Sequence, residues 1–121
     1  MSAKATRTRL PTKRRHEIRR LKIGGHAIHV TVSLYPDGSP AEVFLDMHKQ
    51  GAPLRTFAHA FAMALSIGMQ HGVPASAFVS AFSGLAGEPC GDVEGDAEIT
   101  SAASIPDLVA KLLASLSKAS A

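Results

Sequence analysis

The feature that most constrains the fold is the run HAIHVTVSLY, residues 26–35, in which side-chain character alternates at every position. Ile28, Val30 and Val32 fall on one face of an extended chain, whereas Thr31 and Ser33 fall on the other. A period of two over nine residues, rich in β-branched side chains, is typical of a half-buried strand and excludes an amphipathic helix. The chain must therefore build a sheet with one covered face.

Two turns place further strands on either side of this run. Gly24-Gly25 follows a half-exposed stretch, residues 17–23, and glycine tolerates the positive φ that a two-residue hairpin needs. Pro36-Asp37-Gly38 combines a preset φ, a local hydrogen-bonding side chain and a left-handed position, which together predict a turn. In the third strand Phe44 falls on the outer face and needs a cover. The inner positions of that strand are Val43, Leu45 and Met47.

Beyond residue 53 the apolar period becomes helical. The spacing of Leu54, Phe57, Phe61 and Leu65 predicts a helix whose apolar face includes all four, ending near Gly72 and Pro74. A second helix is expected over 75–85, then a mobile acidic loop over 87–98, and a last helix that begins at Ser104 with Asp107 as its capping partner. The predicted fold class is α+β, a three-stranded antiparallel β-meander packed against two to three α-helices.

Charge is unevenly distributed along the 121 residues. Residues 1–22 carry nine basic side chains and one acid, whereas residues 23–121 carry four basic and nine acidic side chains. The first segment therefore has a charge of about +8 and the rest about −5, by this count. We predict a flexible basic arm over residues 1–15 and a single domain over 16–118, a length usual for one domain.

Two interpretations of the arm stay open. It can bind a phosphate-bearing or acidic partner, or it can be a solubilising tail that folds back onto its own acidic body. The candidate partner-binding or nucleic-acid-binding residues are Arg7, Arg9, Lys13, Arg14, Arg15, Arg19, Arg20 and Lys22.

The residue inventory gives no support for catalysis. The six histidines lack metal-ligand spacing, and Cys90 lies beside Asp92 and Glu94, whose charge opposes thiolate formation. We therefore expect no catalytic residue, no metal and no cofactor. Apolar stretches shorter than ~18 residues and a basic N-terminus without an apolar continuation predict neither a membrane span nor a secretory signal, so a cytoplasmic location is expected. The oligomeric state, a homo-oligomer included, is left open.

The order of these elements resembles a known family. The strings IGGHAIHVTVSLYPDGSPAEVFLDMHKQG, ALSIGMQHGVPASAFVSAF and ASIPDLV are similar to the C-terminal region of vitamin B12-dependent ribonucleotide reductases, often called the TSCPD domain. The resemblance covers about residues 10–116. The positions that carry it include Gly24, Gly25, Tyr35, Asp37, Gly38, Glu42, Lys49 and Gln70.

The resemblance implies an accessory or regulatory module without the reductase's catalytic barrel, and the chain looks like a free-standing copy of it. The literal Thr-Ser-Cys-Pro-Asp string and a C-terminal cysteine pair are both absent, so no family catalytic residue transfers to this sequence. The expected function is binding to a reductase or to a nucleotide or nucleic-acid partner, in deoxyribonucleotide metabolism. The alternative is a small nucleic-acid-binding protein that acts through its basic arm.

Overall fold

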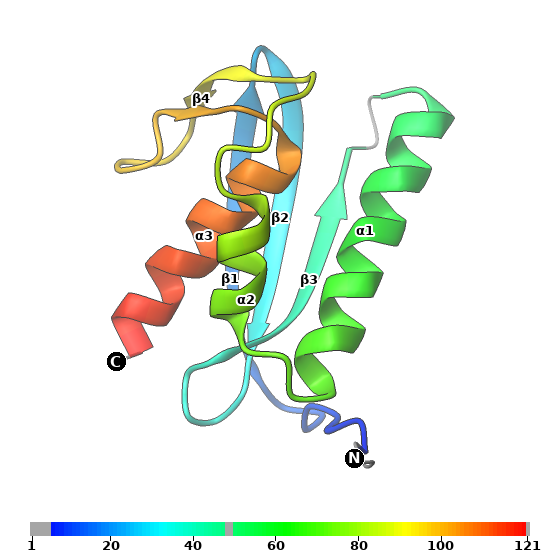
Figure 1. Cartoon of the computed structure of the whole chain (residues 1–121), viewed down its shortest axis with the longest axis vertical. Coiled ribbons are helices and arrows are strands. Elements are labelled where there is room, and N and C mark those ends of the chain that lie inside the picture. Colours follow the sequence, from blue (N-terminus) through cyan, green and yellow to red (C-terminus); the bar gives the residue numbers. More distant parts are fainter. Residues whose placement is uncertain (1–5, 48–49, 121) are drawn as a thin grey trace.

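Figure 1 presents a computed structural model of the chain, in which residues 6–47 and 50–120 are described, 118–120 by their backbone alone. The elements follow one another from a three-stranded antiparallel meander through two helices to a short hairpin and a final helix. They are β1 (Arg15–Ile23), β2 (His26–Leu34), β3 (Pro40–Asp46), α1 (Ala52–Gln70), α2 (Ala75–Phe82), β4 (Gly91–Glu94), β5 (Ser101–Ala102) and α3 (Ile105–Ser120).

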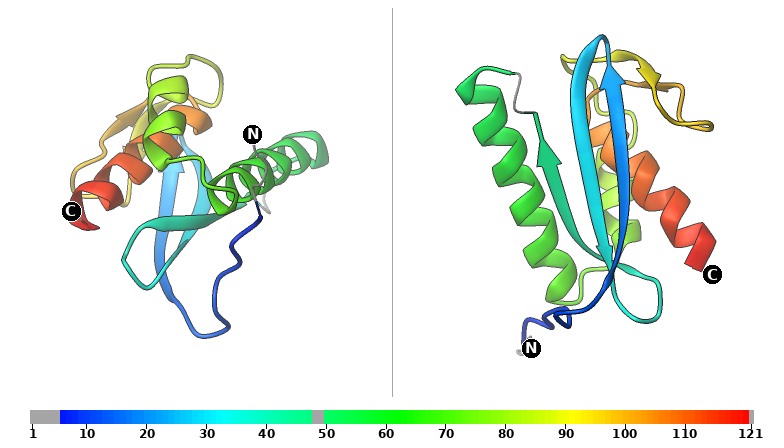
Figure 2. Two further views of the ribbon diagram at one scale, coloured as in Figure 1. Left: turned by 60° about the horizontal axis from the view of Figure 1, so that its bottom comes forward. Right: turned by 180° about the vertical axis from the view of Figure 1, so that it is seen from behind.

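The strands form one antiparallel sheet in the order β3-β2-β1-β4-β5. In the central hairpin Arg15 pairs with Leu34 and Ile23 with His26, the register that the Gly24-Gly25 turn imposes. All three helices lie on one side of the sheet. Seen from behind, β1 and β2 stand in front and no helix covers them (Figure 2). The predicted α+β class and its three-stranded meander are confirmed.

Within the described residues the sheet has two strands more than expected. β4 and β5 lie in or just after the stretch that the sequence predicts as a mobile loop, and they pair with each other through Gly91 and Ala102. β4 joins the main sheet because Ile23 pairs with Val93. Four and two residues are too few to show an alternating pattern, and only Val93 in β4 is apolar and buried. Pairing with β1 therefore decides this segment, not its local sequence.

The core lies between the inner face of the sheet and the helices. Alternate residues of β1 to β3 are buried there, and the inward direction of Val43, Leu45 and Met47 is confirmed. Leu65 and Met69 of α1 close one side. Phe44 stays 44% exposed on the rear face of the sheet, the face away from the helices. The largest fully buried apolar side chains are Ile23, Ile28, Leu108, Leu113, Val30, Val43 and Val109.

Gly24 is the point where the first hairpin meets the added strand. Its φ of +54° lies in the left-handed region, and its N–H donates to the carbonyl of Asp92 at 2.9 Å. A Cβ at this position would collide with the main-chain carbonyl oxygen of Cys90. Gly25 also has a positive φ, +84°, but a Cβ there would meet no atom within 4 Å.

The two glycines give a matched test of this contact. Gly25→Ala is expected to lower the free energy of unfolding by about 1–2 kcal/mol, the usual cost of a left-handed non-glycine residue. Gly24→Ala should cost about 1–3 kcal/mol more, because β4 must move away from the hairpin. Chemical denaturation of both variants measures the difference. Equal losses would show that the approach of Cys90 does not constrain the turn.

Candidate functional site

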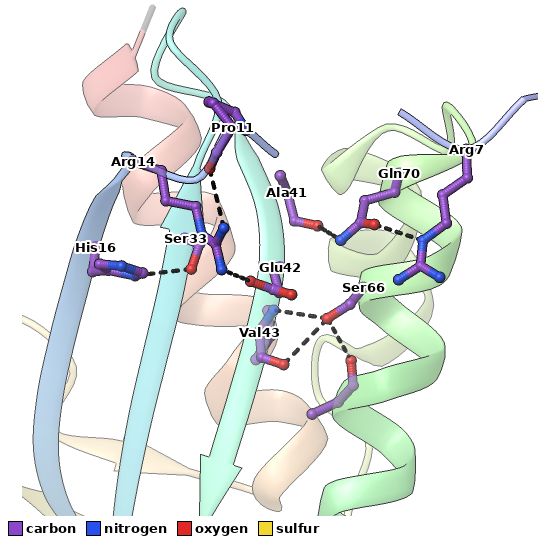
Figure 3. A network of polar contacts seen from close by, with 11 residues as sticks. Arg7, Pro11, Arg14, His16, Ser33, Ala41, Glu42, Val43, Ser66 and Gln70 are labelled. Carbon is purple, nitrogen blue, oxygen red and sulfur yellow. Dashed lines mark hydrogen bonds and ion pairs between the residues drawn. The ribbon is translucent and has the colours of Figure 1, made fainter. Parts of the chain in front are cut away.

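Helix α1 lies along the free edge of the sheet and satisfies the hydrogen bonds of that edge. Ser66 is buried, and its Oγ accepts the N–H of Val43 at 2.9 Å (Figure 3). The same Oγ lies 3.2 Å from the carbonyl oxygen of Val43 and 2.8 Å from that of Ala62, the two acceptors available to its proton. The main-chain N–H and C=O groups of an edge strand can pair with a strand of another chain. Because the Ser66 hydroxyl occupies these groups, it both anchors the helix and blocks such edge pairing.

Gln70, one helical turn later, also binds the edge strand, and in addition it binds the N-terminal arm. Its Nε2 donates to the carbonyl of Ala41 at 3.2 Å, while its Oε1 accepts from Nε of Arg7 at 2.7 Å. Its main-chain oxygen accepts the N–H of Thr8 at 2.6 Å. Four helical residues rise about 6 Å, and two strand residues about 6.6 Å. This match lets Ser66 and Gln70 reach alternate residues of β3.

The side of α1 away from the core exposes mostly apolar side chains, together with the polar residues Thr56 and His59. Phe57 is 75% exposed, Met63 49% and Ile67 41%, and Ala60 and Ala64 between them are exposed too. We call these five residues the outer arc of α1. A helix with one side on a core normally carries charges on its other side, yet the single formal charge in this 19-residue helix is Arg55.

Phe57 also borders a hollow of about 240 Å³ between α1 and the segment that leads to α3. Leu85, itself 49% exposed, lines the hollow from the other side, and Ile105 and Pro106 contribute to it. The outer arc adjoins this hollow at Phe57, and the mostly apolar lining of the hollow also includes Glu88 and Ser104. The sequence assigned Phe57 to the inner apolar face; this is wrong, because the helix turns that side chain into solvent.

Three of the eight predicted partner-binding residues are engaged within the chain. Arg7 contacts Gln70, and Arg14 lies 3.5 Å from the carboxylate of Glu42 while donating to the carbonyl of Pro11 at 3.1 Å. Figure 3 shows both contacts beside β3. Arg19 pairs with Glu17 at 3.1 Å and with Asp96 at 3.3 Å. The charges of Arg14 and Arg19 are thus largely compensated within the fold.

The other five are exposed and have no ion-pair partner among the residues that the structure describes. Arg20 and Lys22 alternate with the buried Leu21 and Ile23 of β1, so they lie on the rear face of the sheet, on which Ile18 and Phe44 are also exposed. That these cations bind a partner stays a prediction. The remaining members of the group are Arg9, Lys13 and Arg15, which lie at the start of β1 and before it.

The positions that carry the family resemblance have structural roles in the turns and at the sheet edge. The Tyr35 hydroxyl donates to the carbonyl of Thr8 at 2.7 Å, and its burial raises the pKa of the phenol. Asp37 accepts the hydroxyl and N–H of Ser39, hydrogen bonds that lower the pKa of its carboxyl. Gly38 has a φ of +90°, as the predicted turn requires. Lys49 lies outside the described residues.

Over residues 6–47 and 50–120, no group of three or more histidine, cysteine or acidic side chains lies close enough to hold a metal ion. Within the same ranges no helix has the length and apolarity to cross a membrane.

Asp96 ties the second hairpin to β1 and gives a pH-dependent test of this network. The N–H of Ile99 is the main cause that lowers the pKa of its carboxyl from the usual 3.8; those of Glu98 and the Arg19 guanidinium add to it, against the effect of burial. A lowered pKa stabilises the fold above pH 3.8, and the contribution is lost as the pH falls through the folded-state value.

Asp96→Asn should therefore lower the free energy of unfolding at pH 7 by up to about 1 kcal/mol, the upper range for a partly exposed ion pair. The deficit should shrink progressively below pH 4, in urea titrations at several pH values. Asp92→Asn, at an exposed carboxylate in the same hairpin, is the control and should cost little at any pH. A deficit of constant size down to acid pH would contradict the role given to the charge.

Comparison with protein families and curated proteins gives consistent matches. The family model for the TSCPD domain matches residues 3–117. A vitamin B12-dependent ribonucleotide reductase of Bradyrhizobium diazoefficiens is 42% identical over 108 residues, and that of Agrobacterium fabrum is 40% identical over 108 residues. That of Rhodopirellula baltica is 39% identical over 110 residues. No solved structure matches significantly.

These matches cover most of this chain but little of the relatives. The aligned segments take in 89%, 89% and 91% of the chain, yet only 9%, 8% and 10% of the three reductases. The chain is thus similar to one small region of much longer proteins, and the resemblance inferred from the sequence is confirmed.

Proposed function

Because the chain belongs to the TSCPD domain family, we propose that it is a non-catalytic accessory domain that docks on a vitamin B12-dependent ribonucleotide reductase. The observation that carries this proposal is the outer arc of α1, an exposed and uncharged helical surface. In the relatives the matching region is joined to about nine tenths of a reductase chain that this sequence does not align with. The rest of such a reductase is therefore the occupant that we assign to the arc.

The composition of the arc fits a protein partner better than a polar ligand. Phe57 can enter a complementary pocket as an aromatic anchor, and Ala60 and Ala64 allow a facing helix to approach closely. Met63 adapts its shape to an irregular contact. Removing such a surface from water is favourable at roughly 25 cal/mol per Å². Since the arc carries no charge, docking loses no ion hydration on this side.

The first test replaces two residues of the arc. Met63→Glu/Ile67→Glu should weaken binding to the Bradyrhizobium diazoefficiens reductase from which the matching 108 residues have been deleted. Both side chains are nearly half exposed, 49% and 41%, so the variant should fold, whereas binding would now bury two carboxylates. We expect a loss of about 30-fold or more, equal to the ~2 kcal/mol of a typical interface hot spot, in surface plasmon resonance.

The matched control is Ser80→Glu/Ala81→Glu, which adds the same two charges to exposed positions of α2. It should bind as the unchanged protein does. Equal binding by both variants would contradict docking through the arc. Loss of self-association by Met63→Glu/Ile67→Glu in light scattering, with no change in reductase binding, would show that the arc joins two copies of the chain and would also overturn the proposal.

A second candidate function is nucleic-acid binding through the basic arm and β1. The observation that favours it is the set of exposed cations without a described ion-pair partner. Arg20 and Lys22 share the rear face of the sheet with the exposed ring of Phe44, and nucleic-acid bases stack on such rings. Glu42 and Asp46 also lie on this face, which weakens the case and makes this candidate second.

Salt dependence tests this second candidate. If the cations bind phosphates, log K for a single-stranded oligonucleotide should fall linearly with log salt. Arg9→Gln/Lys13→Gln/Arg15→Gln should make the slope shallower by about 2, since each phosphate contact contributes about 0.7. Fluorescence anisotropy measures the slope. Arg55→Gln, which removes an exposed cation from α1, is the control; a slope unchanged in the triple variant would rule out the arm as the contact.

A further inference from the structure

A second hollow lies where the basic arm meets the end of the central hairpin. Its volume is about 300 Å³, at the lower end of the range for small-molecule pockets. The floor and walls are apolar: Leu34 is 3% exposed, and Pro11, Tyr35 and Pro36 surround it. The Tyr35 ring is held in place because its hydroxyl donates to the carbonyl of Thr8. Tyr35 therefore contributes an aromatic side chain with an anchored hydroxyl to the lining of the hollow.

The rim of this hollow is basic. Its lining includes Lys13, Arg14 and Arg15. These three cations differ in whether an acid of the protein already pairs with them. Arg14 is compensated by Glu42 and held by the carbonyl of Pro11. Lys13 and Arg15 are exposed and have no ion-pair partner within the described ranges. Two free cations thus stand beside an apolar floor.

No acidic side chain of the described residues lines the hollow. Asp37, in the adjacent turn, accepts the hydroxyl and N–H of Ser39, and its negative charge contributes to the raised pKa of Tyr35. The hollow therefore offers an apolar surface for a planar ring. The cations Lys13 and Arg15 in its lining can bind an anionic group attached to that ring.

We propose that this hollow binds a nucleotide, with the base against the Tyr35 ring and the phosphates between Lys13 and Arg15. A ring joined to phosphates has both features that the hollow can complement. Base–aromatic stacking is worth about 1–3 kcal/mol, and hydrogen bonds to charged groups are about twice as strong as neutral ones. The site is independent of the outer arc of α1, so it stands or falls separately from the reductase docking proposed above.

The sequence provides a direct probe, because Tyr35 is the only tyrosine in the chain. In protein labelled on tyrosine rings, ATP should shift the single set of ring signals in a saturable NMR titration. Adenosine and inorganic tripolyphosphate, each with half of the proposed contacts, should bind about tenfold more weakly or worse. Lys13→Gln/Arg15→Gln should weaken ATP binding by about tenfold or more.

The control is Arg20→Gln/Lys22→Gln, which removes two exposed cations from the rear face and so lowers the net charge equally. It should leave the ATP titration unchanged. Equal weakening by both double variants, or tripolyphosphate binding as tightly as ATP, would show unspecific attraction of phosphate and overturn the proposal. So would Tyr35 signals that do not move with ATP. An oligonucleotide that shifts these signals when ATP does not would assign the hollow to nucleic acid and equally overturn it.

Discussion

The position of α1 depends on two side chains that complete the edge of the sheet. Ser66 and Gln70 bind the main-chain groups of Val43 and Ala41, where a further strand would otherwise have to pair. Unpaired edge groups that are shielded from water cost more free energy than a hydrogen bond returns, so a helix without these side chains could not pack closely there. Gln70 also receives Arg7, which joins the arm to the same edge. Sheet, helix and arm are thus fixed at one place.

The exposed arc of α1 follows from this attachment. Because the helix turns its polar Ser66 and Gln70 and its buried Leu65 and Met69 towards the sheet, the opposite side must face outwards. A free surface helix gains solubility from charges on that side. Here the side carries the apolar outer arc, with Thr56 and His59 as further exposed residues, and the docking proposed above would cover it. The same geometry leaves the rear face of the sheet open and separates it from the arc.

The parts of the fold with a strong local pattern could be predicted from the sequence, and those fixed by distant contacts could not. Alternation over residues 26–34 and the two turns define the meander without further information. β4 is too short for such a pattern and exists through its pairing with Ile23. The charge-poor composition of α1 signals the outer arc, but apolar spacing alone could not show which side Phe57 occupies. Arg19 meets Asp96 across 77 positions, a pairing that no local pattern encodes.

Some cations of the basic N-terminal segment pair with acids of the same chain, and this changes how the excess of positive charge in that segment is interpreted. Arg14 and Arg19 compensate acids of the folded body, so the binding capacity of the basic segment is smaller than its count suggests. The free cations then divide by place: Lys13 and Arg15 stand beside an apolar hollow, and Arg20 and Lys22 on an open strand face. A concave site selects a small ligand by shape, whereas an open face attracts any extended anion. Folding back onto the body thus accounts for Arg7, Arg14 and Arg19, and partner binding stays a prediction for the other basic residues of the segment.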